Sequence, residues 1–156
     1  MIKIQRILFP TDFSTNSKFA QEYACQLAEH FSAELHLLYV VQDMTLMGPD
    51  IGSTSTMPAS SMDEARASAE QALARLPDVG TLTAAKQIVR ATRPGTPFVE
   101  IVRYARENEI DIIVLGTHGR TGLVHVLLGS VAENVVRKAP CPVLTIRPTD
   151  HKFVMP

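Results

Sequence analysis

Short apolar runs alternate with stretches of helical periodicity along the 156-residue chain. Parallel strands are joined by long crossovers that usually contain a helix, and these crossovers are almost always right-handed. The alternation therefore predicts an α/β fold with an open, five-stranded parallel sheet and helices on both of its faces. The apolar runs predicted as strands are residues 2–9, 35–41, 84–90, 111–115 and 143–146. The run 84–90 is the more polar one, which favours an edge position in the sheet.

The first two predicted helices have recognisable starts. Apolar residues recur at three- and four-residue steps over 19–31, and Ser14 or Asn16 is the expected N-cap, because either side chain can accept a hydrogen bond from a first-turn N–H. The stretch 43–60 has no such periodicity and is predicted to be a long flexible loop. The capping box Ser61-x-x-Glu64 then predicts the start of the second helix.

The third and fourth predicted helices follow proline and glycine signals. Thr96 is the expected N-cap of the third helix, and Pro97 occupies its first position, where a missing N–H costs nothing. This helix continues toward Asn108. The fourth helix is predicted after the glycine-rich segment and stops before Pro140.

Composition limits the classes of partner. Fifteen basic residues nearly balance sixteen acidic ones, so no net field draws the chain to nucleic acid or to an anionic membrane. No apolar run approaches the roughly 20 residues that cross a bilayer, and the N-terminus does not read as a signal peptide. Cys25 and Cys141 form no Cys-x-x-Cys pair. One soluble, cytoplasmic domain over 1–156, with reduced thiols and no membrane insertion, is therefore expected.

A glycine-rich segment carries the most specific chemical signal. Gly116 is expected directly after a strand, where the absence of a Cβ lets the backbone turn sharply and approach a ligand. Gly129 and Ser130 are expected where the last helix begins, so its first N–H groups and positive dipole end would bind phosphate oxygens. Ser130 adds a hydroxyl donor, while His118 and Arg120 add hydrogen bonds or charge at the outer phosphates.

A second interpretation is that these glycines only form turns, because a glycine-rich loop after a strand is by itself a weak signal. The spacing matches neither G-x-x-x-x-G-K-[ST] nor G-x-G-x-x-G, which excludes a P-loop and a dinucleotide fingerprint. Position favours a ligand, since open parallel sheets bind ligands beyond the C-terminal ends of their strands. Segments 10–12 and 116–119 follow the first and fourth strands and are expected to form the walls of that crevice.

The glycine spacing resembles the pattern Gly-x2-Gly-x9-Gly-(Ser/Thr) of the ATP-binding branch of the universal stress protein family. The matching residues are Gly116, Gly119, Gly129 and Ser130. Segments similar to the family's opening and ending are 7–14, 127–133 and 139–144. The resemblance implies a Rossmann-like sheet of strand order 3-2-1-4-5, homodimerisation, and binding of ATP or AMP.

The resemblance also implies roles for single residues. Asp12 is expected to hydrogen-bond the ribose, and Pro10, Thr11 and Val40 are expected to line the adenine pocket. The residues expected to hold ribose and phosphates are Leu115, Gly116, Thr117, His118, Gly119, Gly129, Ser130 and Val131. For Asp12 a purely local role is the alternative, because Asp is favoured in turns and near N-caps.

Metal binding and catalysis have less support. His118 and His125 are isolated from other metal-binding side chains, so no transition-metal site is predicted. Binding of Mg²⁺ or Mn²⁺ through the nucleotide phosphates is left as an alternative. No residue can be assigned to orient a nucleophile for rapid phosphoryl transfer. The adenylyl-transfer signatures His-x-Gly-His and Ser-Gly-Gly-x-Asp-Ser are both absent.

Two functions from different classes follow. The first is a homodimeric, nucleotide-responsive regulatory protein of the stress response, whose state is read by partner proteins. The second is a slow ATPase or nucleotidyl-transfer enzyme. A dimerisation module without a ligand is disfavoured by the intact glycine spacing. The apolar run 143–146, expected at a sheet edge, is the predicted dimer interface.

Overall fold

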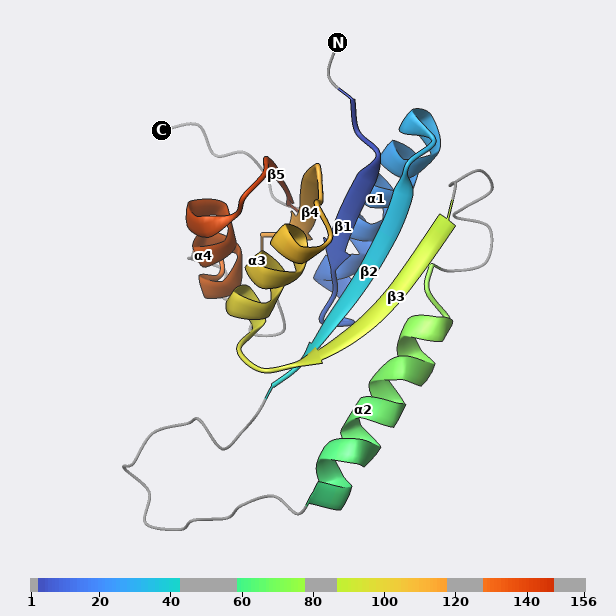
Figure 1. Cartoon of the computed structure of the whole chain (residues 1–156), viewed down its shortest axis with the longest axis vertical. Helices are drawn as coiled ribbons and strands as arrows, with labels where there is room; N and C mark the ends of the chain where they lie inside the picture. The colour runs from blue at the N-terminus through green and yellow to red at the C-terminus, as the bar shows by residue number, and fades with distance from the viewer. Residues whose placement is uncertain (1–2, 43–58, 78–86, 118–127, 148–156) are drawn as a thin grey trace.

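The computed structural model describes residues 3–42, 59–77, 87–117 and 128–147. Its elements are β1 (Arg6–Pro10), α1 (Thr15–Phe31), β2 (Glu34–Val41), α2 (Ala59–Ala74), β3 (Gln87–Pro94), α3 (Pro97–Glu107), β4 (Ile112–Gly116), α4 (Ser130–Lys138) and β5 (Val143–Ile146). The strands form one five-stranded parallel sheet of order β3-β2-β1-β4-β5 (Figure 1). The predicted fold class and strand order are confirmed.

The sheet separates two apolar layers, because successive side chains of a strand point to opposite faces. In β1, Ile7 and Phe9 pack in the cluster that contains α1 residues and Leu73 of α2. Leu8 packs in the cluster formed with α3 and α4. None of these three β1 side chains has any exposed surface. The helices α1 and α2 thus cover one face of the sheet, and α3 and α4 cover the other (Figure 1).

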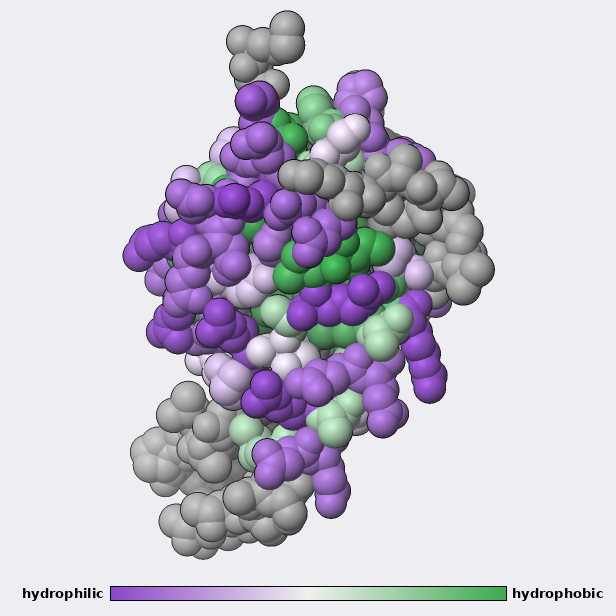
Figure 2. Space-filling model, turned by 45° about the vertical axis from the view of Figure 1, so that its right-hand side comes forward, coloured by the Kyte–Doolittle hydropathy of each residue, from purple (hydrophilic) through white to green (hydrophobic). Residues whose placement is uncertain are grey.

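The face of the molecule shown in Figure 2 is mainly polar. On the face in Figure 2, hydrophilic residues predominate and apolar residues gather in a central patch. Helix α2 illustrates the pattern, since Ala69 and Leu73 are buried while Arg66 and Glu70 are exposed and bonded to each other. No helix in the described part of the chain is long and apolar enough to cross a bilayer.

The start of α1 agrees with its capping signal. Ser14 has extended backbone angles, and its hydroxyl accepts a hydrogen bond from the backbone N–H of Ser17 at 3.3 Å. Ser14, rather than Asn16, is therefore the N-cap. Strand β1 begins at Arg6, later than the predicted 2–9, because the pairing with β2 starts where Arg6 meets Glu34.

Two further boundaries differ from the sequence prediction. Helix α2 begins at Ala59, so Ser61 is not its N-cap and the predicted capping box is wrong; Ala is a strong helix former and extends the helix upstream. Strand β3 reaches Pro94, which pairs with Val41, although 84–90 was the predicted span and its residues 84–86 lie outside the described part. An edge strand tolerates proline because one side of its ladder has no partner. Thr96 is the N-cap residue of α3, but its side chain makes no capping hydrogen bond.

A histidine is buried between β2 and α3. His36 is 5% exposed, and its Nδ1 lies 3.0 Å from the Tyr104 hydroxyl. Its Nε2 has no hydrogen-bond partner among the described residues and lies 3.7 Å from Glu34 Oε2. Burial lowers the pKa of His36, and the nearby Arg6 lowers it further, while Glu34 acts in the opposite direction.

The lowered pKa predicts how stability depends on pH. The unfolded chain binds a proton at this histidine near pH 6.5, whereas the folded chain binds it only at lower pH. The stabilisation that neutral His36 gives to the folded chain is therefore complete above pH 6.5, and it is lost as the pH falls toward the folded pKa. In His36→Gln, the free energy of unfolding should decline less steeply between about pH 6.5 and 5 than in the parent chain. Urea titrations across that range measure both slopes, and equal slopes would contradict the assignment.

Candidate functional site

The turn after β1 is anchored to its neighbours by buried hydrogen bonds. The Thr11 N–H donates to the Leu38 carbonyl at 2.9 Å, which continues the β1–β2 pairing past the end of β1. The Thr11 side chain is buried, and its Oγ1 accepts from the Phe13 N–H at 3.0 Å. The same oxygen lies 3.2 Å from Ser17 Oγ on α1. Strand, turn and helix are thus joined at one threonine.

Asp12 has a definite local role. Its Oδ1 accepts a hydrogen bond from the Ser14 N–H at 2.9 Å, which closes an Asx-turn. Asp12 is half-buried at the C-terminal end of β1. Asp12 therefore has the turn-forming role that was the alternative to ribose binding. The same hydrogen bond fixes the position of its carboxylate.

The next residue is held in an unusual conformation. Phe13 has φ of 60°, in the left-handed region that bulky side chains avoid. Its ring stacks on Tyr39 of β2, with ring centroids 4.6 Å apart. Sequence reasoning missed this pair because Phe13 carries no turn signal, and only the packing of β2 beside β1 brings Tyr39 to it.

The end of β4 is tied to both β5 and α4. Gly116 is the last residue of β4 and pairs with Ile146, so it is not the turn residue that the sequence predicted. The Thr117 N–H donates to the Ile146 carbonyl at 2.9 Å, and the Thr117 carbonyl accepts from the Gly129 N–H at 2.7 Å. Thr117 is only 2% exposed. This bridge places the start of α4 beside the C-terminal end of β4.

The first turn of α4 has N–H groups that the helix itself does not pair. Gly129 is its N-cap, and the Gly129 carbonyl accepts from the Glu133 N–H at 2.9 Å. The N–H groups of residues 130–132 have no carbonyl partner within the helix. The N–H of Gly129 itself donates to the Thr117 carbonyl, so the N–H groups that the helix leaves unpaired are those of the residues after it.

The backbone angles of Gly129 do not require glycine. Its φ is −64° and its ψ is 152°, a conformation that any residue adopts. Ser130 is exposed at the helix start, whereas Val131 is half-buried. A glycine at position 129 is thus not explained by backbone strain.

The fold brings most of the predicted site residues to one end of the sheet. Strands β1 and β4 are neighbours, so 10–12 and 115–117 lie at adjacent strand ends. Val40, Leu115 and Val131 share one apolar cluster on the face covered by α3 and α4. Connections from β1 lead to β2 on one side and from β4 to β5 on the other, which makes this end the switch point. The remaining predicted residues, His118, Gly119 and Arg120, lie outside the described residues.

The described residues offer little for cysteine chemistry or metal binding. Burial raises the pKa of the Cys25 thiol to about 12, so this cysteine stays protonated and unreactive. Burial also raises the pKa of Cys141. Within the described ranges, no group of His, Cys, Asp and Glu side chains is arranged to hold a metal ion.

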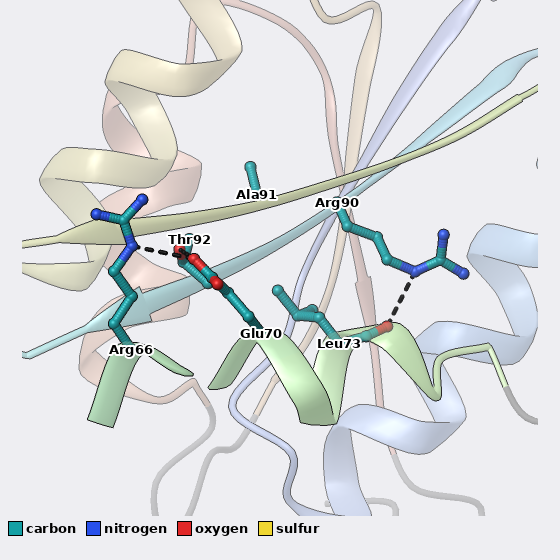
Figure 3. Close-up of a pocket in the computed structure, with 6 residues that line it drawn as sticks. All are labelled: Arg66, Glu70, Leu73, Arg90, Ala91 and Thr92. Carbon is teal, nitrogen blue, oxygen red and sulfur yellow. Dashed lines mark hydrogen bonds and ion pairs between the residues drawn. The ribbon is translucent and has the colours of Figure 1, made fainter. Parts of the chain in front are cut away.

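A hollow of about 280 Å³ lies between α2 and β3 (Figure 3). Its polar groups bind one another: Glu70 accepts from Arg66 and Thr92. Arg90 donates to the carbonyls of Leu73 and Leu76 near the end of α2. These bonds satisfy the last carbonyls of the helix and attach it to the sheet edge. The polar side chains of this hollow therefore serve to pack α2 on the sheet.

Comparison with known proteins identifies the family. The model described as "Universal stress protein family" matches residues 3–147, and the chain belongs to that family. Universal stress protein MJ0531 of Methanocaldococcus jannaschii is 36% identical over 144 residues, covering 92% of this chain and 82% of the relative.

Solved structures agree with that assignment. Universal stress protein UspA from Lactobacillus plantarum is 30% identical, with a TM-score of 0.80 over 94% of this chain and 100% of its own. A universal stress protein solved in complex with cAMP is 25% identical, with a TM-score of 0.60 over 94% of this chain and 98% of its own.

The Ser14 cap predicts a measurable contribution to stability. Ser14→Ala removes the side-chain acceptor for the Ser17 N–H and leaves only the Ser14 carbonyl at 3.1 Å, so it should lower the free energy of unfolding by about 0.5 to 2 kcal/mol. Thr15→Ala, at the neighbouring exposed helix position, is the matched control and should change it by less than about 0.5 kcal/mol. Urea denaturation of both variants makes the comparison, and equal losses would show that Ser14 does not act as a cap.

Proposed function

We propose that this chain is an adenine-nucleotide-binding regulatory protein of the stress response that acts as a homodimer. ATP or AMP would bind at the C-terminal ends of β1 and β4, and the bound state would be read by partner proteins. A solved family member 25% identical to this chain is described in complex with cAMP, which supports an adenine nucleotide as the ligand class.

The start of α4 is the observation that carries this proposal. N–H groups without an intrahelical partner and the positive end of the helix dipole favour anion binding at a helix N-terminus. The bond between the Gly129 N–H and the Thr117 carbonyl holds that terminus at the switch point, where ligands of open parallel sheets bind. The Gly129 backbone does not require glycine, and close approach of a phosphate would account for the missing side chain there.

The remaining roles follow from position. Pro10, Thr11 and Val40 would contact the adenine, and the carboxylate of Asp12, held by Ser14, would accept from the ribose hydroxyls. Leu115 to Gly119 and Gly129 to Val131, with Arg120, would surround ribose and phosphates. Mg²⁺ or Mn²⁺ would bind through the phosphate oxygens, since phosphates are the usual ligands of such ions.

Ligand-induced stabilisation tests the site. ATP with Mg²⁺ at one hundred times its Kd should stabilise the fold by about 2.7 kcal/mol. For a domain of this size the melting temperature should rise by about 5 to 10 °C. Gly129→Val should abolish most of that shift, because valine adopts the same backbone angles but fills the phosphate space. Differential scanning fluorimetry on nucleotide-free protein measures these shifts.

Two controls separate a phosphate defect from misfolding. Adenosine lacks phosphates, so its smaller shift should survive Gly129→Val, whereas Asp12→Ala should weaken adenosine and ATP alike. Chromatography of the nucleotide after incubation distinguishes the regulatory role from slow ATPase activity, which would yield ADP. Absence of any ATP shift in the stripped parent chain would end the nucleotide proposal.

Exposed apolar residues support a dimer through β5. Strand β5 is an edge strand with β4 as its partner, and Leu144 is half-buried. Val136 of α4 is 47% exposed. It lies on the side of α4 away from α3, because Lys138, about 200° further round the helix, contacts Phe98 of α3.

Helix α1 also has exposed apolar side chains on the β5 side of the molecule. Tyr23 and Phe31 are 50% and 37% exposed, and with Leu27 they form a stripe at four-residue steps. Helix α1 runs antiparallel to the strands, on the face of the sheet that α2 also covers, and it contacts β4 and β5. Because the helix is right-handed, the residues of this stripe lie on its side nearer β5. Apolar side chains from both layers therefore flank the unpaired edge of β5, as expected for an interface between two copies.

The dimer proposal predicts the effect of surface charges. Tyr23→Glu and Val136→Glu each place a carboxylate in the interface and should convert the dimer largely to monomer. Leu144 is less suitable for this purpose, because it also packs in the core. Val99→Glu, at an exposed valine on α3, is the matched control and should leave the mass unchanged. Light scattering on the size-exclusion peak gives the masses; a dimer in all three variants would place the interface elsewhere.

A further inference from the structure

The outer face of α3 carries an apolar surface that neither the sheet nor α4 covers. A hollow of about 550 Å³ lies there, lined by Phe98, Val99, Val102, Arg103, Arg106, Glu107 and Lys138. Val99 is 36% exposed, and Phe98 and Val102 are half-buried. The ring of Phe98 lies under the Lys138 ammonium group of α4, 4.8 Å away.

The lining follows one helical stripe. Val99, Val102, Arg103 and Arg106 stand at steps i, i+3, i+4 and i+7 and face away from the buried Ile101 and Tyr104. Such a stripe along an 11-residue helix is about 16 Å long, which is enough to contact two to three turns of another helix. Helix-in-groove recognition uses anchors at this same spacing.

The charge of this surface is locally positive. Arg103 pairs with Glu100 of its own helix at 2.5 Å, and Glu107 pairs with Arg93 at 3.0 Å, so Arg106 and Lys138 supply the uncompensated positive charge. Within the described residues, Arg106 and Lys138 form no ion pair. The whole chain has a formal net charge of −1, so the positive character belongs to this surface in particular.

The proposed dimer and nucleotide site leave this surface unused. Tyr23, Phe31 and Val136 flank the β5 edge, whereas Val99 is on the outer side of α3, which packs beside α4 and over β2. Phosphates are expected at the start of α4, and the hollow reaches α4 only at Lys138, its last residue. Apolar anchors within a rim of cations are thus available to a further molecule.

We propose that the outer face of α3, with Lys138 of α4, binds an acidic amphipathic helix of a partner protein. The apolar side of that helix packs on Phe98, Val99 and Val102. Its Asp and Glu side chains pair with Arg106, Lys138 and the exposed part of Arg103. Docking here requires no nucleotide, so this proposal and the nucleotide proposal fail independently.

A designed peptide tests the surface in the full chain. The probe is a fluorescein-labelled, 15-residue helical peptide with Leu at i, i+3, i+4 and i+7 and Glu at the flanking positions. Fluorescence anisotropy should give a Kd below about 1 mM. Lys138→Glu and Val99→Glu should each weaken binding at least about tenfold. Hydrogen exchange with the peptide present should slow in α3.

Matched variants distinguish this surface from general charge attraction. Arg137→Glu changes the net charge by the same amount as Lys138→Glu, on the adjacent residue, but outside the hollow. It should leave the Kd within about twofold of the parent value. A peptide with Lys in place of every Glu should bind at least about tenfold more weakly.

Four results would overturn the proposal. They are no binding of the acidic peptide at about 1 mM, equal loss in Arg137→Glu and Lys138→Glu, equal binding of the Lys peptide, and tighter binding of a single-stranded DNA oligonucleotide that competes with the peptide. Conversion of the dimer to monomer by Val99→Glu would assign the surface to a second copy of this chain instead.

Discussion

The complete burial of β1 is the constraint on which the remaining structure depends. Ile7, Leu8 and Phe9 have no exposed surface, because one strand supplies side chains to both apolar layers. Pairing with β2 on one side and β4 on the other satisfies its backbone, so no edge of β1 meets water. A strand in this position separates the two halves of the sheet, and the switch point lies where it ends.

Short hydrogen bonds fix the segments that leave the switch point. Thr11 connects the turn after β1 to β2 and to α1, and Thr117 connects β4 to β5 and to the start of α4. Both threonines are buried, so their polar groups need these partners in place of water. The start of α4 is consequently held by the sheet rather than by its own cap, since Gly129 has no side chain to accept a hydrogen bond.

Most local signals predicted local structure well, although the capping box at Ser61 was wrong. The serine at position 14, the proline at position 97 and the apolar periodicity of 19–31 act through neighbouring residues, and the corresponding elements are present. Strand boundaries were predicted wrongly where pairing with a strand distant in the sequence determines them. Gly116 continues β4 because Ile146 pairs with it, and β3 reaches Pro94 because β2 continues to Val41. The stack of Phe13 on Tyr39 likewise joins two strands that are adjacent only in the fold.

The sequence alone determined the fold class, the order of its elements and which segments reach the C-terminal end of the sheet, because periodicity and turn residues encode these locally. The resemblance carried by its glycine spacing determined the family. Only the tertiary structure decided that the Gly129 N–H binds Thr117, that His36 is buried with no hydrogen bond from Nε2 to another described residue, and that Val99, Arg106 and Lys138 share one surface. These facts depend on contacts between residues far apart in the chain, and such contacts exist only after the sheet has brought its helices together.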